Sequence, residues 1–337
     1  MKNFNEESYL RIGKNTVALK SRVDEIVDEV SKKGFKNVFL IGSGGSYAMF
    51  IPFEYYLTTQ SRIQTYCLIA AELMATGHNQ LGAESVCIFT STSGTTKETV
   101  AAAEYCRSKG AVTICISGND QVPYAKNADY AIINKMDDFS ASDADYLLLY
   151  MLTFALMHAA GDFDDYEDFC ANLARMPEAL VSVKEHSDAF CEAFAEQYKD
   201  ETYHLLIGSG SLWGETYSYG MCVMEEMQWI RTKTVRAAEF FHGTLEIVDK
   251  DTSVMLIMGE DANRAMCERV QRFAQRITEH LTVFDTKDYE LPGIDEKYRP
   301  LLSPIVMTAI LDRLSIQLED KRGHSLDIRR YYRVMEY

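Results

Sequence analysis

Leu40-Ile41-Gly42-Ser43-Gly44 recurs about half a chain later as Leu206-Ile207-Gly208-Ser209-Gly210. A short strand-like run precedes each copy, and a helical pattern follows it. A second apolar run stands at nearly the same offset in each half, at residues 85–89 and 253–257. The repeat therefore predicts two copies of one α/β unit, and 337 residues are enough for two domains.

Strand-like and helical patterns alternate along both halves, as they do in parallel α/β layers. The strands expected in the first half are residues 37–42, 64–70, 85–90, 112–117 and 130–133. The strands expected in the second half are residues 203–207, 234–237, 253–258 and 281–285. The helices expected are residues 95–109, 213–229, 261–279 and 303–319, together with most of residues 139–200.

The composition is that of an ordinary globular protein, with 47% apolar and 25% charged residues. A net charge of −16 repels phosphodiester backbones and anionic lipid, so nucleic acid and membrane surfaces are not expected as partners. The eight cysteines form no C-x-x-C pair and are expected to be reduced and mostly buried. No signal peptide is expected, and the longest apolar stretch, residues 146–160, is shorter than a membrane span of roughly 18 residues. We therefore expect a cytoplasmic protein.

The first glycine loop, Gly42-Ser43-Gly44-Gly45-Ser46-Tyr47, joins a strand to a helix, where backbone amides and the helix dipole favour an anion. It is not a dinucleotide fingerprint, because G-x-G-x-x-G requires glycine where Tyr47 stands, and Trp213 occupies that place in the second copy. No G-K-[ST] follows either glycine loop, which excludes a Walker loop. The loops therefore give no support to NAD or ATP as a cofactor.

A second loop, Ser91-Thr92-Ser93-Gly94-Thr95-Thr96, leaves an apolar strand and opens a helix. Hydroxyls and a glycine at a helix N-terminus favour binding of a phosphate monoester. The alternative is an ordinary helix N-cap, which needs only one hydroxyl. The corresponding loop of the second half, Met258-Gly259-Glu260-Asp261, carries carboxylates that would repel phosphate. One phosphate pocket per chain is therefore predicted, in the first half.

The second half contains a cluster of charged residues suited to acid–base chemistry. The cluster comprises Glu225, Glu226, Arg231, Lys233, Arg236, Glu239, His242 and Glu246. Glu226 lies in an apolar run, residues 224–230, and such a setting suits a carboxylate to proton transfer. His242 precedes Gly243 at an expected turn and should be accessible to a ligand. The alternatives are a solvated helix face for the glutamates and a hydrogen-bonded core position for His242.

These motifs together resemble the SIS (sugar isomerase) family of phosphosugar-binding domains in its tandem arrangement, over roughly residues 36–337. Residues 43–46 resemble the family's first phosphosugar loop, C-G-[TG]-S, with Ser43 in place of cysteine. Residues 91–96 resemble the family's phosphate cradle, S-x-S-G-x-T. Residues 239–247 resemble the E-x-x-H-G-P stretch, with Thr244 in place of proline.

The resemblance implies an α/β fold of two tandem SIS domains, each a flavodoxin-like three-layer α/β/α sandwich with a parallel sheet. The implied division is an N-terminal helical segment at 1–35, a first, phosphosugar-binding domain at 36–160, a helical connector at 161–200, and a second domain with a C-terminal tail at 201–337. The implied substrate-binding residues are Gly44, Gly45, Ser46, Ser91, Thr92, Ser93, Thr96 and Glu239.

Within the family, the fructosamine 6-phosphate deglycase branch is the most similar, by residues 224–229, the E-F-x-H-G-x-x-E-I pattern and residues 330–337. The resemblance assigns the proton transfers to Glu226 and His242 as catalytic residues and implies neither a metal nor a cofactor. The substrate would be a phosphorylated sugar joined to an amine. Because the family often supplies its histidine from the neighbouring subunit, a homodimer with the active site at the subunit interface is implied.

Several alternatives stay open. An aldose–ketose phosphosugar isomerase or an aminosugar-phosphate deaminase would use the same Glu226 and His242, and a non-catalytic phosphosugar-binding regulator belongs to another class. The identity of the amine and of the sugar is also open. The basic side chains of the tail either close over the site to meet a substrate carboxylate or phosphate, or make a surface or dimer contact. They are Lys321, Arg322, Arg329, Arg330 and Arg333.

Overall fold

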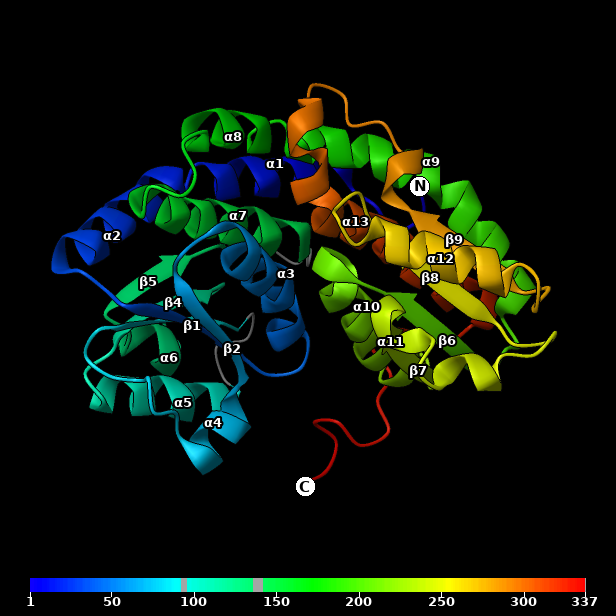
Figure 1. Ribbon diagram of the computed structural model, residues 1–337, viewed down its shortest axis with the longest axis horizontal. Helices are drawn as coiled ribbons and strands as arrows, with labels where there is room; N and C mark the ends of the chain where they lie inside the picture. Colours follow the sequence, from blue (N-terminus) through cyan, green and yellow to red (C-terminus); the bar gives the residue numbers. More distant parts are fainter. Residues whose placement is uncertain (92–95, 136–141, 337) are drawn as a thin grey trace. The chain divides into compact units, whose positions relative to one another are not determined.

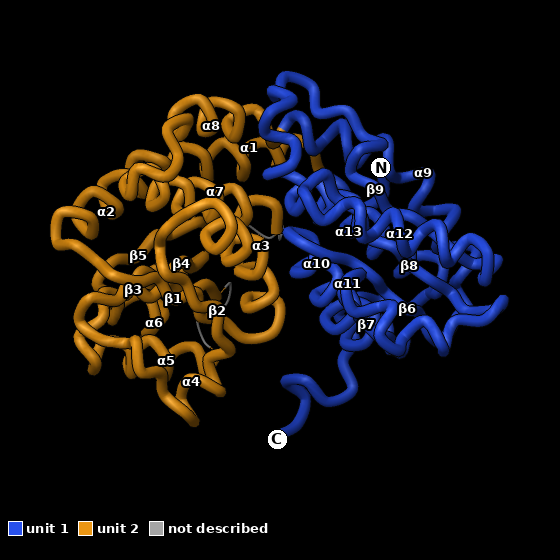
Figure 2. Tube along the Cα trace, in the orientation of Figure 1, with its two compact units in different colours: residues 1–4, 178–337 blue, residues 5–177 orange. Residues whose placement is uncertain are grey.

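The computed structural model describes residues 1–91, 96–135 and 142–336 (Figure 1). The chain divides into two compact units, Asn5–Pro177 and Met1–Phe4 with Glu178–Tyr337 (Figure 2). We call them the first and second units. The division falls inside the connector expected at residues 161–200, and the limits expected for the two domains stay a prediction.

The first unit is built on a five-stranded parallel sheet with strand order β2-β1-β3-β4-β5. Its strands are β1 (Asn37–Gly42), β2 (Gln64–Ile69), β3 (Ser85–Thr90), β4 (Val112–Ser117) and β5 (Tyr130–Ile133). The order is that of flavodoxin-like folds, in which the chain leaves β1 on one side for β2 and on the other for β3. The expected strands of this half are confirmed, because each lies within one residue of its predicted limits.

Helices cover both faces of the first sheet (Figure 1). They are α1 (Glu6–Val17), α2 (Lys20–Lys33), α3 (Gly45–Gln60), α4 (Ala70–Thr76), α5 (Lys97–Ser108), α6 (Pro123–Lys126), α7 (Ser142–Ala159) and α8 (Tyr166–Leu173). Alternate strand residues such as Phe39, Ile41 and Phe89 pack against α4, α5 and α6, since side chains point to opposite faces along a strand. On the other face α3 packs against β1, β2 and α7. This is the expected three-layer sandwich.

The second unit repeats the same topology with a four-stranded parallel sheet in the order β7-β6-β8-β9. Its strands are β6 (Tyr203–Gly208), β7 (Arg231–Arg236), β8 (Val254–Met258) and β9 (Leu281–Asp285). The described part of the unit contains no counterpart of β5. β7 begins at Arg231, three residues before its expected start. The first residues of this edge strand are polar or charged, so an apolar run does not mark where it begins.

The helices of the second unit differ more from expectation than the strands do. They include α9 (Met176–Tyr198), α10 (Trp213–Ser218), α11 (Ala237–Phe240), α12 (Arg264–Ala274) and α13 (Arg299–Arg322). The continuous helix expected at 213–229 is wrong, because a π-helix, η2 (Tyr219–Glu225), follows α10 and the chain then turns. π-Helical segments occur preferentially at functional sites.

Helix α13 is the core helix of the second unit. The helical stretch Glu296–Arg322 is long and apolar enough to cross a membrane by length and composition, but 83% of its most apolar window is buried inside the protein. The eight cysteines are free thiols, six of them buried, as expected from their spacing. Burial raises the pKa of Cys115 and of Cys267 to about 12, so these thiols stay protonated and inert.

The first glycine of each repeated loop lies where a helix packs directly on the end of a strand. A Cβ atom on Gly42 would lie 2.7 Å from the backbone nitrogen of Tyr47. A Cβ atom on Gly208 would lie 1.9 Å from Oγ1 of Thr216. Both distances are shorter than van der Waals contact, so no other residue fits without movement of the helix. The repeat is therefore explained by the same close approach in both units.

We expect Gly42→Ala and Gly208→Ala each to lower the free energy of unfolding by about 1–3 kcal/mol, because the added methyl group overpacks a rigid contact. Urea denaturation measures the change. Gly82→Ala is the matched control, since a Cβ there would have no neighbour within 4 Å. Equal unfolding midpoints for all three variants would show that the helices are not held against the strands in this way.

Candidate active site

The two loops predicted to hold phosphate follow neighbouring strands of the first unit. The glycine loop follows β1 and the hydroxyl-rich loop follows β3, and these strands are parallel neighbours, with Ile41 opposite Phe89. Their carboxyl ends meet at the point where strand order reverses, which is where open α/β sheets bind ligands. Residues 44–46 and Ser91 therefore lie at the same end of these two strands.

The glycine loop presents a helix N-terminus at this position. Gly44 caps α3 with a φ of 57°, a left-handed conformation that favours glycine, and it is exposed. Gly45 and Ser46 form the first turn of the 16-residue helix. The hydroxyl of Ser43 is buried and has no hydrogen-bond partner in the described part of the chain. Because an unsatisfied buried hydroxyl costs about 1–3 kcal/mol, this loop is suited to receive an oxygen from a ligand.

The hydroxyl-rich loop is described only at its two ends. Ser91 is buried, and its backbone N–H donates to the carbonyl oxygen of Ile116 at 3.2 Å. Thr96 caps α5, but its side chain makes no capping hydrogen bond. The ordinary capping role considered for the loop is therefore not filled by the Thr96 hydroxyl. Thr92 and Ser93, which were also expected to bind phosphate, lie outside the described residues.

The corresponding loop of the second unit already contains anions. Oδ2 of Asp261 accepts hydrogen bonds from the backbone N–H of Ser211 at 2.7 Å and from its hydroxyl at 2.6 Å. Oδ1 of Asp261 accepts from the backbone N–H of Asn263 at 2.7 Å. Only glycine fits at position 210, where a Cβ would lie 2.5 Å from Oδ2 of Asp261. The Asp261 carboxylate thus accepts hydrogen bonds from Ser211 in the loop after β6 and from Asn263 in the loop after β8.

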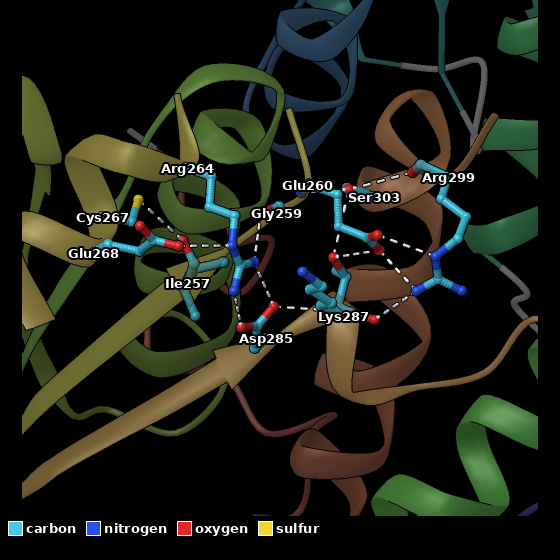
Figure 3. Close-up of polar contacts among 11 residues, drawn as sticks. Ile257, Gly259, Glu260, Arg264, Cys267, Glu268, Asp285, Lys287, Arg299 and Ser303 are labelled. Carbon is cyan, nitrogen blue, oxygen red and sulfur yellow. Dashed lines mark hydrogen bonds and ion pairs between the residues drawn. The ribbon is translucent and has the colours of Figure 1, made fainter. Parts of the chain in front are cut away.

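The neighbouring carboxylate of this loop is also engaged, as Figure 3 shows. Glu260 pairs with Arg299 through both oxygens, at 2.8 Å from Nη2 and 3.0 Å from Nε. Beside it, Arg264 binds both oxygens of Asp285, at 2.8 and 2.6 Å, and contacts Glu268 at 3.0 Å (Figure 3). These interactions support the expectation that the second unit does not hold phosphate at this loop.

A cavity of about 460 Å³ opens beside the same network. Its lining residues are Met258, Arg264, Glu268, Gln271, Arg272, Gln275, Val283, Asp285 and Asp288. The carboxylates of Asp285 and Glu268 neutralise Arg264, and desolvation raises the pKa of Asp288. The cavity therefore offers little net positive charge to an anionic sugar.

Glu226 lies one residue beyond η2, and 30% of its side chain is exposed. Nε of Arg329 donates to Oε1 of Glu226 at 2.8 Å. The apolar setting expected for Glu226 is therefore wrong in this respect, because a guanidinium group contacts the carboxylate. The adjacent Glu225 is exposed and accepts a hydrogen bond from Oγ1 of Thr232 at 2.6 Å. The alternative considered for both glutamates was a solvent-exposed position. It applies to Glu225 but not to Glu226.

His242 and Glu239 lie at the short helix α11, and both side chains are exposed. The backbone N–H of His242 donates to the carbonyl oxygen of Glu239 at 2.9 Å. Gly243 follows with a φ of 147°, so the chain turns sharply after His242. The core position considered for His242 is wrong. The fully buried histidine of this unit is His204, whose pKa is lowered to about 4 by burial.

Glu226 and His242 flank the same strand of the second unit along the chain. Glu226 precedes β7 and His242 follows it. Glu225 contacts Thr232, near the start of β7, whereas α11 leaves its end. Six residues of a parallel strand span about 17 Å. Glu226 and His242 are thus separated along the chain by the full length of this strand.

Comparison with known proteins agrees with the observed topology. The SIS domain model matches residues 33–159, which include all five strands of the first sheet. Fructosamine deglycase FrlB of Bacillus subtilis (strain 168) is 30% identical over 96% of this chain and 99% of that protein. The chain belongs to the SIS domain family. The parallel sheets of both units are consistent with two tandem SIS domains.

Further relatives extend this SIS family assignment along the whole chain. Fructoselysine 6-phosphate deglycase of Escherichia coli O157:H7 is 23% identical over 92% of this chain and 89% of that protein. A solved structure of a candidate phosphosugar isomerase from Bacillus subtilis has a TM-score of 0.90 and 29% identity, and covers 96% of this chain and 99% of that one. The similarity therefore includes the second unit as well as the first.

Two further residues lie beside the predicted site residues. Ser43 stands where the family pattern has cysteine, and its buried hydroxyl, which has no partner in the described part of the chain, makes it a further ligand candidate. Arg329 was one of several basic tail residues without an assigned position, and the structure places it on Glu226. The separation of 103 residues between the two left no signal in the sequence for this contact.

We expect Asp261→Ala to lower the free energy of unfolding by about 1–3 kcal/mol, because the Ser211 and Asn263 donors lose their acceptor. Asp261→Asn keeps one acceptor oxygen and should cost less. Urea denaturation of both variants is the measurement. Asp251→Ala is the control, because Asp251 is exposed and only approaches Lys250 at 3.9 Å. If Asp261→Ala changed stability no more than the control, the carboxylate would not be holding the two loops.

Proposed function

We propose that this SIS family protein is an enzyme that cleaves fructosamine 6-phosphates, releasing an aldose 6-phosphate and a free amine. The observation that carries the proposal is similarity to two deglycases over 92–96% of the chain. The motif resemblance adds Glu226 and His242 as the residues proposed to transfer protons. The proposal does not assign either relative's substrate to this protein, so the identity of the released amine is not specified. A cytoplasmic location is part of the proposal.

The phosphate of the substrate would bind at the edge of the first sheet. Gly44, Gly45 and Ser46 offer the N-terminus of α3, and the loop ending at Thr96 offers that of α5. Neutral amides and hydroxyls hold a phosphate without a basic surface, which suits a protein of net charge −16. Ser91, Thr92 and Ser93 complete this set in the proposal.

The chemistry would be general acid–base catalysis at the first two carbons of the sugar. Ring opening, assisted by His242, exposes the C2 carbonyl group. Glu226 removes a proton from C1, and a proton is then delivered to C2, which leaves a C1–nitrogen double bond. Water adds to C1, the carbon–nitrogen bond breaks, and the amine leaves with a proton as the aldehyde forms. Glu239, exposed one helical turn before His242, would contact the substrate.

The separation of Glu226 from His242 by β7 supports a site shared between two copies of the chain. One copy would supply Glu226 and its partner would supply the histidine, because the two residues of one second unit lie beyond opposite ends of a strand. A homodimer with twofold symmetry makes two such sites. The dimer is therefore part of the proposal.

The proposal is tested by measuring glucose 6-phosphate release from fructosamine 6-phosphates with different amines in a coupled dehydrogenase assay. Glu226→Gln should lower kcat by about 100-fold or more, because it cannot accept the C1 proton. Glu225→Gln is the matched control and should retain activity, since Glu225 bonds only to the Thr232 hydroxyl in the described structure.

The same assay separates the other candidate functions. Turnover of only fructose 6-phosphate or glucosamine 6-phosphate would replace the deglycase with an isomerase or a deaminase. Binding of phosphosugars without any turnover would indicate a regulator. Wild-type activity in Glu226→Gln would falsify the assigned mechanism.

The shared site is tested by mixing two inactive variants, Glu226→Gln and His242→Ala, through coexpression. Half of the dimers are then mixed, and each mixed dimer regains one complete site, so about a quarter of wild-type activity should return. Each variant expressed alone is the control. Failure of the coexpressed pair to exceed its parents, with mixed dimers demonstrated by two affinity tags, would place both residues in a site of one chain.

A further inference from the structure

The last residues of the chain return to the segment that carries Glu226. We call residues 323–336, which follow α13, the C-terminal strap. The side-chain amide of Gln228 donates to the carbonyl oxygen of His324 at 2.9 Å. The ring of His324 meets the ring of Trp229 edge-on, with 4.4 Å between centroids. The guanidinium carbon of Arg330 lies 3.9 Å from the centroid of the same Trp229 ring. Two points of the strap therefore hold one tryptophan.

Trp229 has an unusual backbone conformation, with a φ of 57°. A bulky residue in the left-handed region is strained, and such strain persists only where surrounding contacts hold it. Backbone hydrogen bonds hold the turn on either side of Trp229, from the N–H of Gln228 to the carbonyl oxygen of Val223 at 2.9 Å and from the N–H of Ile230 to that of Met224 at 2.8 Å. The strap adds two contacts to the Trp229 ring, which is 36% exposed, and so supports this turn from outside.

Arg329 lies between the two strap residues that contact Trp229. Its Nη1 donates to the carbonyl oxygens of Leu326 and Ile328, at 2.5 and 3.1 Å, which fixes the guanidinium group on the strap itself. Its Nε donates to Oε1 of Glu226 at 2.8 Å. Oε2 of Glu226 has no recorded partner within the described part of the chain. The contact thus orients the carboxylate and leaves one oxygen available.

We propose that Arg329 is a positioning residue for Glu226: the strap holds the carboxylate by one oxygen so that the other can reach the C1 proton. The inference rests on the proposed function, because it assigns Glu226 as the base. The opposite role would be a cap, in which Arg329 must leave before Glu226 can react. The geometry favours positioning, since a guanidinium fork that blocked the carboxylate would bind both oxygens.

The test compares Arg329→Ala with Arg329→Lys in the full-length protein. Arg329→Ala should lower kcat by about 10- to 100-fold with little change in KM, because a misplaced base slows proton transfer without weakening phosphate binding. Arg329→Lys keeps the charge and should recover part of the loss. Methylguanidinium added to Arg329→Ala should raise kcat as well. A purely structural role would not produce recovery by an added guanidinium.

Arg333→Ala is the matched control, because it removes the same charge from the strap. Within the described residues, the interaction of Arg333 is with the Tyr332 ring, at 5.2 Å. The kcat of this control should stay within about twofold of wild type, and the Tm of Arg329→Ala should change by less than about 4 °C. A kcat for Arg329→Ala at or above wild type would overturn the proposal and identify a cap. A rise in KM with unchanged kcat would overturn it in favour of a substrate-binding arginine.

A double-mutant cycle keeps this test separate from that of the proposed function. Glu226→Gln, Arg329→Ala and their combination are compared by Tm, which requires no substrate. Non-additive Tm shifts establish the ion pair even if the wild type had no deglycase activity, in which case the proposed function alone fails. Strictly additive Tm shifts would show that Arg329 and Glu226 do not interact. The positioning role of Arg329 would then be overturned whatever the activity of the protein.

Discussion

Direct contact between a helix and the end of a strand is the constraint on which the rest of this structure depends. At Gly42 and Gly208 the following helix approaches so closely that no Cβ fits. The chain must then leave the strand in a tight loop and begin its helix at once, so the free amides of the helix point to the strand ends. In the first unit, the loop after β1 lies at the point where strand order reverses, beside the end of β3. The proposed phosphate position therefore depends on this packing as well as on the residues of the loop.

Duplication gave the second unit the same constraint but a different solution for the amides. There Asp261 satisfies donors from the loops after β6 and β8. Glu260, which precedes it, is paired with Arg299. The Asp261 carboxylate is part of the chain and is always present at these loops. A phosphate ligand would lose translational and rotational entropy each time it bound there. The second unit thus satisfies these donors with a carboxylate of its own chain, whereas the first unit is the one proposed to bind phosphate.

The sequence predicted the strands well and the surroundings of Glu226 poorly, for a physical reason. Buried strands are local patterns: five or six apolar residues between turns identify them. β7 began earlier than expected because Arg231 and Lys233 lie on an exposed edge. The π-helix before Glu226 has no such pattern, since its residues would suit an ordinary helix. The glycine and hydroxyl loops were recognisable because their chemistry is contained in six consecutive residues.

The environment of Glu226 depends instead on contacts between distant segments. Neighbouring methionines and Trp229 suggested an apolar pocket, yet the contacting group is Arg329, 103 residues away. Nothing in residues 323–336 separates Arg329 from Arg330 or Arg333 by type; the distinction arises only when Trp229 holds the strap on both sides of Arg329. Position along the strap, and not charge, therefore decides which arginine meets the carboxylate. Trp229, three residues after Glu226, is the side chain through which the tail contacts the segment that carries this carboxylate.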